Sequence, residues 1–348
     1  MYKIGILGCN GNIGSLILEK ISKFEDNYIY AVSRNNNKNV IKRNNVQYTV
    51  FDIENNEKLN DFISRCQVVI NCTGKYKTNI MDICIKNGVD YIDPSFIDID
   101  GIDETFKRMK SNCIICSAGC NPGLTEILTK YINEKFNPEM CEILFSGNGN
   151  MSKSAVEELL DISMEHKSIF RSFIKSNNLE KMEYWDMKRN LGYLCGDVVC
   201  IPVINQAFFR CIKNTDINIA YFYNTFKSEK ILSKLIEAKI TIEKENYNKI
   251  ISDIEQLFEK EKESYGCLFT SFHCNLSNTS NAQKDEKIIL ESKMDWNNLT
   301  AVVVVEVITL LKQRKYLKFG IGEVWEVFDC CEIIDDFLNK GYVELKKI

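Results

Sequence analysis

Histidine is scarce in this chain of 348 residues, which contains two, and there is no basic excess, because the net charge at pH 7 is -4. A protein whose main partner is nucleic acid usually carries an excess of Lys and Arg, so we do not expect that partner. The single Cys-x-x-Cys pair, Cys113 and Cys116, has no second pair to complete a zinc site. On a strand its two thiols would also point to opposite faces, and we therefore expect no metal.

Long hydrophobic runs are missing as well. The longest apolar stretch, residues 301–311, is too short to cross a bilayer and contains Glu306, so we expect no membrane partner. We also expect no secretory signal, because the chain begins directly with the pattern of a strand. The fifteen cysteines are then expected to be reduced and mostly buried side chains of a cytoplasmic protein.

What the chain does contain is enough apolar sequence for about two domains, with 45% hydrophobic residues over this length. Strand and helix patterns alternate regularly over the first 136 residues. The expected strands are 2–8, 27–34, 46–52, 67–74, 89–95 and 113–119, and the expected helices are 12–24, 57–66, 78–88, 103–111 and 121–136. This alternation predicts a Rossmann domain, an α/β fold with a doubly wound parallel sheet.

The pattern changes after this region and predicts an α+β domain. Its expected helices are 153–174, with a candidate break midway, 228–239 and 246–263. Its expected strands are 197–206, 217–226, 264–278 and 286–296, preceded by a strand and a glycine loop over 139–150. A buried helix over 298–316, a turn, a helix over 329–339 and a strand over 342–345 follow, and this ending is expected to return to the first domain. The predicted division is therefore 1–120, an inserted domain over 121–295, and a return over 296–348.

The stretch GCNGNIG joins the first expected strand to the first expected helix. A dinucleotide site needs glycines where the strand turns and where backbone approaches the pyrophosphate, with the amino end of a helix facing the anion. A glycine triplet alone is weak evidence, but here it stands in the required context. The residues expected to hold the pyrophosphate are Gly8, Asn10, Gly11, Asn12, Ile13 and Gly14.

The end of the second expected strand indicates which dinucleotide binds. An NAD site places a carboxylate there for the ribose hydroxyls, whereas this chain has Ser33 and Arg34. A guanidinium can pair with a 2′-phosphate, so we expect NADP(H) to be preferred over NAD(H). Asp52, after the third expected strand, is a candidate either to accept a hydrogen bond from the adenine amino group or to cap the following turn.

Three later stretches together resemble the saccharopine dehydrogenase-like group of NAD(P)-dependent oxidoreductases. They are VVINCTGKY at 68–76, MDICIKNGVDYIDPS at 81–95 and SAGCNPGLTEIL at 117–128. The resemblance implies a Rossmann domain completed by the C-terminal segment, with an inserted domain that supplies the substrate pocket and homodimer contacts. It also implies hydride transfer at a carbon–nitrogen bond of a small amino-acid-like substrate, by imine reduction or secondary amine oxidation.

The same stretches supply the remaining candidate residues. Lys75 or Tyr76 could donate a proton, and Asp93 could hold a substrate amine, orient a lysine, or simply organise the turn at Pro94. The lysines could equally hold a substrate carboxylate or be solvated loop charges. Further candidates are Thr73 and Gly74 for the cofactor, and Lys77, Ser95, Cys120 and Asn121 for the substrate.

Two other functions stay open at this point. Tyr131 and Lys135, with Ser117 upstream, match the spacing of a short-chain dehydrogenase, which would act as a reductase or epimerase at a C–O centre. The same Tyr-x-x-x-Lys spacing occurs four times in this chain, so one match carries little weight. The other function is a non-catalytic sensor that binds NADP and has lost the chemistry.

Overall fold

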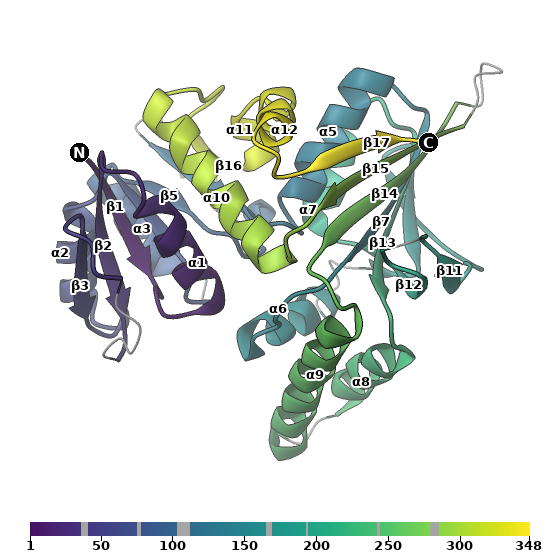
Figure 1. Cartoon of the computed structure of the whole chain (residues 1–348), viewed down its shortest axis with the longest axis horizontal. Coiled ribbons are helices and arrows are strands. Elements are labelled where there is room, and N and C mark those ends of the chain that lie inside the picture. Colours follow the sequence, from purple (N-terminus) through teal and green to yellow (C-terminus); the bar gives the residue numbers. More distant parts are fainter. Residues whose placement is uncertain are drawn as a thin grey trace. The chain divides into compact units, whose positions relative to one another are not determined.

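The computed structural model describes residues 1–35, 41–74, 78–102, 112–164, 169–192, 194–241, 244–278 and 285–348. Two compact units are found in the chain. The first comprises Met1–Ile127 with Asn297–Ile333, and the second comprises Leu128–Trp296 with Ile334–Ile348. Figure 1 follows the chain from purple to yellow, and each unit is described by itself below.

The first unit is built on a seven-stranded sheet in which every neighbouring pair is parallel. The strand order is β16-β6-β5-β4-β1-β2-β3. The strands are β1 (Tyr2–Leu7), β2 (Asn27–Ser33), β3 (Val46–Val50), β4 (Val68–Asn71), β5 (Asp90–Ile92), β6 (Cys113–Cys116) and β16 (Gly320–Glu323). This doubly wound parallel sheet confirms the predicted fold class.

The helices of the first unit follow the predicted alternation. They are α1 (Asn12–Ile21), α2 (Asn56–Ser64), α3 (Thr78–Asn87), the 3-10 helix η1 (Ile99–Gly101), α10 (Trp296–Gln313) and α11 (Val324–Val327). Gly88 ends α3 with a φ of 65°, a conformation that glycine adopts without penalty. The helix expected at 103–111 lies outside the described residues.

The C-terminal segment supplies a strand and a helix to this unit. β16 pairs with β6 in parallel register, although GIGE was expected to be part of a turn. The prediction was wrong because two glycines and a charge obscure the strand pattern, while all four residues are buried in the sheet. α10 confirms the expected buried helix, whose valine-rich sequence by itself also fits a strand.

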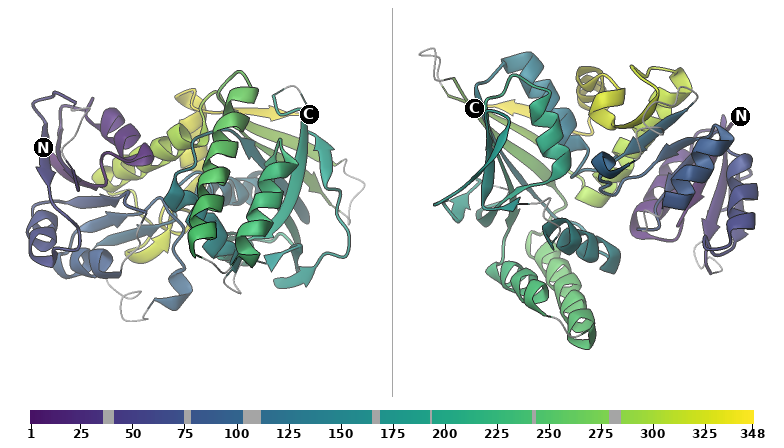
Figure 2. Two further views of the ribbon diagram at one scale, coloured as in Figure 1. Left: turned by 90° about the horizontal axis from the view of Figure 1, so that it is seen from below. Right: turned by 180° about the vertical axis from the view of Figure 1, so that it is seen from behind.

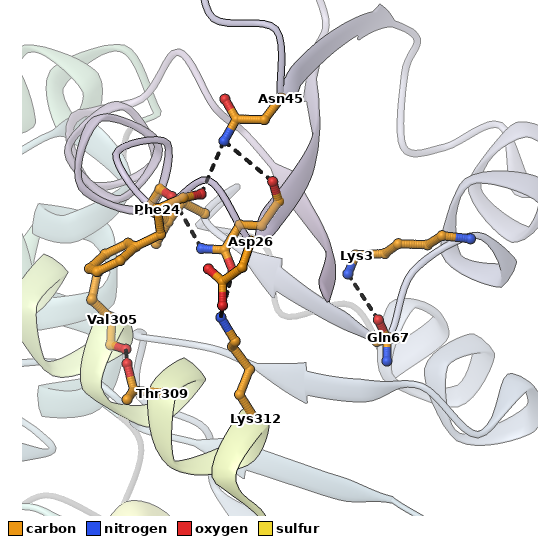
Figure 3. A network of polar contacts seen from close by, with 10 residues as sticks. Lys3, Phe24, Asp26, Asn45, Gln67, Val305, Thr309 and Lys312 are labelled. Atoms are coloured by element: carbon orange, nitrogen blue, oxygen red, sulfur yellow. Dashed lines mark hydrogen bonds and ion pairs between the residues drawn. The ribbon is translucent and has the colours of Figure 1, made fainter. Parts of the chain in front are cut away.

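α10 is tied to the amino edge of the sheet by a polar network (Figure 3). Lys312 Nζ donates to Asp26 Oδ2 at 2.6 Å and to Asn27 Oδ1 at 3.0 Å. Asn45 Nδ2 donates to the carbonyl oxygens of Phe24 at 3.2 Å and of Asn27 at 3.3 Å. The helix is therefore held against the turn between α1 and β2, at the end of the sheet opposite the glycine loop.

The second unit contains a mixed sheet of ten strands. The main path runs β10-β9-β13-β7-β14-β15-β17, with β12 beside β13 and with β8 and β11 beside β12. The strands are β7 (Met140–Gly147), β8 (Ile169–Phe170), β9 (Ser172–Lys175), β10 (Asn178–Lys181), β11 (Lys188–Asn190), β12 (Asp197–Ile204), β13 (Ile219–Phe226), β14 (Thr270–Ser277), β15 (Glu286–Ser292) and β17 (Glu344–Lys347). The expected α+β character is therefore observed.

Helices of the second unit are α5 (Leu124–Phe136), which begins in the first unit, α6 (Lys153–Met164), α7 (Gln206–Lys213), α8 (Glu229–Ile240), α9 (Lys244–Ser264) and α12 (Cys330–Asn339). α8 and α9 lie side by side (Figure 2) and bury apolar side chains such as Ile231, Ile251 and Phe258 with those of α6.

Two expectations for this part of the chain were wrong, and one helix was missed. The helix expected over 153–174 ends at Met164 and is followed by β8 and β9. α7 was not predicted. The final strand, β17, was expected to return to the first domain. It instead pairs with β15 in antiparallel register. Its alternating apolar and charged residues suit the half-exposed edge of an antiparallel sheet better than a buried parallel one.

The cysteines behave as predicted: all fifteen are free thiols, and twelve of them are buried. Among the described residues, no helix is both long and apolar enough to span a membrane.

Candidate functional site

The candidate site lies at the carboxyl edge of the first unit's sheet, where the strand order reverses. β1 has β2 on one side and β4 on the other. In open α/β sheets, ligands bind beyond the carboxyl ends of the strands at such a reversal. The loop after β1 and the loop after β4 meet there, because an added Cβ on Gly8 would lie 2.6 Å from the carbonyl oxygen of Cys72.

The glycines of the loop after β1 have separate reasons to be glycine. Gly8 has a φ of 81°, which side chains rarely adopt, and it touches the backbone of Cys72. A Cβ on Gly14 would overlap the carbonyl oxygen of Gly8 and lie 3.1 Å from Cys9 Cα. Gly11 has a φ of -73° and a ψ of 167°, which any residue can adopt. Gly8 and Gly14 therefore allow α1 to begin directly against the turn.

The amino end of α1 presents uncapped backbone N–H groups. The first turn of a helix has no acceptors for its N–H groups within the helix. Gly11 is the N-cap and supplies no side-chain oxygen, and the first turn of α1 contains no acidic residue. Asn10, Gly11 and Asn12 are exposed, and Ile13 is half-buried. This cradle, with its glycine approach and its partial positive charge, fits the pyrophosphate of a dinucleotide.

The end of β2 carries the residues expected to select the cofactor. Ser33 is 8% exposed and its Oγ donates to the carbonyl oxygen of Asn35 at 2.6 Å. Arg34 is exposed and follows directly. Asp52 Oδ1 accepts the backbone N–H of Glu54 at 3.0 Å, so of its two alternatives the structure favours the turn cap.

A buried hydrogen-bonded network lies beyond β4 and β5. Asp93 Oδ2 accepts the Tyr91 hydroxyl at 2.6 Å and Asn71 Nδ2 at 2.9 Å. On the other side of Asn71, Oδ1 accepts Thr73 Oγ1 at 2.7 Å and the Thr73 N–H at 3.3 Å. Asn71, Tyr91 and Asp93 are each 1% exposed. The network therefore connects the half-buried Thr73 to a carboxyl group in the interior.

Asp93 also organises its own loop. Its Oδ1 accepts the backbone N–H of Ser95 at 2.9 Å, and its carbonyl oxygen accepts the Ala118 N–H at 2.8 Å. Burial raises the pKa of the Asp93 carboxyl to about 6 and outweighs the hydrogen bonds from Tyr91, Ser95 and Asn71, which act to lower this pKa. The side chain does not reach the surface, so the structure favours the expectation that Asp93 organises the turn.

The AGCNPG stretch packs directly on this loop. A Cβ on Gly119 would lie 2.6 Å from the carbonyl oxygen of Pro94, which explains why a glycine is needed there. Cys120 is 3% exposed, and its backbone N–H donates to Thr300 Oγ1 at 3.1 Å. Asn121 is half-buried, and its Oδ1 accepts Thr125 Oγ1 at 3.3 Å. Cys120 therefore belongs to the packing of the first unit rather than to its surface.

The structure thus brings most of the predicted residues to one edge of one sheet. Gly8, Gly14 and Thr73 surround the strand reversal, Gly74 follows with a φ of 65°, and Ser95 lies on the neighbouring loop. The three residues Lys75, Tyr76 and Lys77 lie outside the described residues.

Asn71 and Tyr91 were missed by sequence reasoning. The available signal was a polar residue closing an apolar strand, since Asn71 follows VVI in β4. A further buried carboxylate, Glu323, ends β16 opposite Cys116 and accepts Trp325 Nε1 at 2.7 Å. A buried polar group of this kind needs such partners, and the sequence alone does not identify them.

The residues of the short-chain dehydrogenase alternative are arranged differently. Ser117 belongs to the first unit, whereas Tyr131 and Lys135 belong to the second. Tyr131 is 7% exposed, and Lys135 Nζ lies 5.8 Å from the centre of its ring. This geometry is that of a cation–π contact on a helix surface.

Comparison with known proteins agrees with the resemblance drawn from the sequence. Residues 4–125 match the family model described as the saccharopine dehydrogenase NADP binding domain. Comparison with curated protein sequences gives no significant match.

Among solved structures, the apo saccharopine dehydrogenase (L-Glu forming) from Saccharomyces cerevisiae matches with a TM-score of 0.65 and 11% identity, covering 100% of both chains. A variant of the meso-diaminopimelate dehydrogenase from Clostridium tetani, with its ligand DAP, matches with a TM-score of 0.44 and 16% identity over 94% of each chain. At 11% identity, the likeness to the yeast enzyme shows a shared fold.

Proposed function

We propose a specific reaction for this NAD(P)-dependent oxidoreductase. The proposal starts from the match of residues 4–125 to the saccharopine dehydrogenase NADP binding domain. The protein transfers hydride at a carbon–nitrogen bond of an amino-acid-like substrate, by imine reduction or secondary amine oxidation. NADP(H) is the preferred cofactor. When bound, the cofactor supplies or accepts the hydride.

The glycine turn carries this proposal. Gly8 and Gly14 bring the uncapped amino end of α1 to the strand reversal, where backbone N–H groups can hold a pyrophosphate. The matched family model is named for NADP binding, and the residues of this turn lie within the match. Thr73 and Gly74 face the same edge from β4, so we assign them to the cofactor as well.

Cofactor preference is assigned to Arg34. An exposed guanidinium after β2, with no acidic neighbour in the sequence VSRNNNK, can form a charge-assisted pair with the 2′-phosphate. Arg34→Asp removes that pair and adds a like charge. Since such a bond contributes about 1.5–3 kcal/mol, we expect NADPH to bind about 10- to 150-fold more weakly. NADH should bind within about threefold of its parent affinity, because it lacks the phosphate.

A matched control is Arg43→Asp, which makes the same change of charge on an exposed residue before β3, at the amino edge of the sheet. Titration of each protein with NADPH and NADH by fluorescence gives the four affinities. Equal NADPH affinity for Arg34→Asp and Arg43→Asp would contradict the assignment of the 2′-phosphate to Arg34.

Roles for the substrate-side residues follow from the family resemblance. We propose that Lys75 or Tyr76 donates the proton that accompanies hydride transfer. Lys77, Ser95 and Asn121 are assigned to the substrate. Asp93 is buried and holds the Ser95 loop, so its part is to orient neighbours. Because Cys120 is buried in the packing of the first unit, we assign it no direct contact with the substrate.

The reaction is tested by following NADPH absorbance with a panel of 2-oxo acids, each with and without an amino acid or ammonia. Turnover that requires both the carbonyl and the amine supports chemistry at a carbon–nitrogen bond. Turnover with the carbonyl compound alone favours the C–O reductase. Tight binding of NADPH without turnover across the panel favours the sensor. The homodimer is tested by light scattering of the purified chain.

A further inference from the structure

The hydrogen bonds around Asn71 have a fixed direction. An ionised carboxylate can only accept, so Asp93 Oδ2 must face the amide nitrogen of Asn71, at 2.9 Å. The amide oxygen of Asn71 then faces Thr73, and it accepts Thr73 Oγ1 at 2.7 Å. The backbone N–H of Thr73 points at the same oxygen from 3.3 Å, which favours the same orientation.

This direction determines what the Thr73 hydroxyl can do. A hydroxyl has one proton and two lone pairs, and the proton of Thr73 is used toward Asn71. Toward any ligand, Thr73 Oγ1 can therefore only accept. Asn71 and Asp93 are each 1% exposed, so neither can easily turn to solvent, whereas Thr73 is half-buried at the carboxyl edge.

The strand order indicates which ligand group meets Thr73. A dinucleotide with its pyrophosphate on the loop after β1 extends to both sides of that strand. Arg34 follows β2 on one side, where the 2′-phosphate of the adenosine half is assigned, and Thr73 follows β4 on the other side. The nicotinamide half therefore lies on the side of Thr73.

We propose that Asp93 and Asn71 are positioning residues that fix Thr73 as a hydrogen-bond acceptor for an N–H or O–H group of the nicotinamide half of the cofactor. This inference rests on the proposed function. Two groups of that half are donors, the carboxamide NH2 and the ribose hydroxyls, and either one matches the acceptor.

The test compares NADPH with 2′,5′-ADP, which has the adenosine phosphates but lacks the nicotinamide half. Thr73→Val keeps the shape of the side chain and removes the acceptor. At pH 8 it should weaken NADPH binding about three- to tenfold, the range of one neutral hydrogen bond. Binding of 2′,5′-ADP should stay unchanged, and Thr73→Ser should restore NADPH binding. The control is Thr309→Val, whose hydroxyl bonds its own helix at Val305.

A second variant reverses the direction of the network without removing Thr73. In Asp93→Asn the amide oxygen stays on the Ser95 N–H, as Oδ1 does at 2.9 Å in the parent. The new NH2 then faces both Asn71 and the Tyr91 hydroxyl, which donates to Oδ2 in the parent. Both have to turn, and Asn71 then donates to Thr73 Oγ1 and loses its bond from the Thr73 N–H. The Thr73 hydroxyl proton then points toward the ligand, where it faces the proton of the ligand's own donor group. Asp93→Asn should therefore weaken NADPH binding by at least as much as Thr73→Val, again without effect on 2′,5′-ADP.

The reduced 3-acetylpyridine analogue of NADPH, which lacks the carboxamide NH2, separates the two donors. If Thr73→Val weakens NADPH but not the analogue, the carboxamide is the donor. Equal weakening of both identifies a ribose hydroxyl, and either result supports the proposal. Unchanged NADPH binding in Thr73→Val, or equal weakening of NADPH and 2′,5′-ADP, overturns it. If the parent binds neither ligand, the proposed function itself has failed.

Discussion

Replacing Gly14 with alanine is the most direct perturbation of the anion-binding turn. The new Cβ would overlap the carbonyl oxygen of Gly8 and lie 3.0 Å from its carbonyl carbon and 3.1 Å from Cys9 Cα. Carbon atoms pack at about 3.5–4.0 Å. All these neighbours are backbone atoms, so no side chain can rotate away, and the first turn of α1 has to move outward.

The size of the effect follows from the hydrogen bonds that this movement disturbs. The carbonyl oxygen of Gly8 also accepts the Gly11 N–H at 3.0 Å, so the whole turn shifts with it. If two backbone N–H groups lose charge-assisted bonds to the pyrophosphate, at about 1.5 kcal/mol each, the loss is about 3 kcal/mol. We therefore expect NADPH to bind about 100-fold more weakly.

The assay is a fluorescence titration with NADPH, alongside circular dichroism and thermal melting of the free protein. Overpacking of this kind costs about 1–3 kcal/mol of folding stability, so a lower melting temperature with unchanged secondary structure is expected. Gly101→Ala is the control, because its Cβ would lie 3.8 Å from Asp98 Oδ2 and, among the described residues, within 4 Å of no other atom beyond its chain neighbours. A Gly14→Ala protein that is folded and binds NADPH within threefold of the parent would refute the assigned role of the turn.

Two further predictions concern stability. Lys312→Met removes the bonds to the exposed Asp26 and the buried Asn27 and should cost about 1–2 kcal/mol in chemical denaturation. The control Lys293→Met breaks an exposed pair with Glu344 at 3.7 Å and should cost less than about 0.5 kcal/mol. Equal costs would contradict the role of Lys312. Burial lowers the pKa of His273 to about 4. As the pH drops from about 6.5 to 4, the imidazole is therefore protonated in the unfolded chain but not in the folded one. The free energy of unfolding should fall over this range by up to about 3 kcal/mol. The raised pKa of Asp93 acts in the opposite direction over part of this range, so the measurement is the difference between parent and His273→Gln, and a difference that does not change with pH would contradict the prediction.

The cofactor half of the site was predictable because its signals are local. Gly14 is needed because an added Cβ would meet the backbone of Gly8 and Cys9, and Gly8 because it approaches the backbone of Cys72. The strand–turn–helix context of both glycines was visible in the sequence. Arg34 was predicted in the same way, as the residue after a strand, and its role stays a prediction. These features depend on short segments whose conformations largely follow from their own residues.

The Asp93 network was not predictable in detail. Asn71 reaches partners 20 and 22 residues away, and nothing in the strand pattern identifies which polar side chains meet. The sequence left Asp93 with several roles, and the observed bonds to Tyr91, Asn71 and Ser95 favour one of them. Long-range hydrogen bonds of this kind form only when the sheet brings the strand ends together.

The sequence by itself determined the parallel sheet and the glycine turn, and it pointed to the resemblance that the family model over residues 4–125 supports, because periodicity, turn residues and short motifs depend on neighbours in the chain. Only the tertiary structure decided where the C-terminal segment belongs. β16 extends the first sheet and β17 extends the second, and between these two strands the chain passes from the first unit to the second at Ile333 and Ile334. A single short strand carries too little information to choose a sheet, so its place depends on which open edge matches its burial and direction.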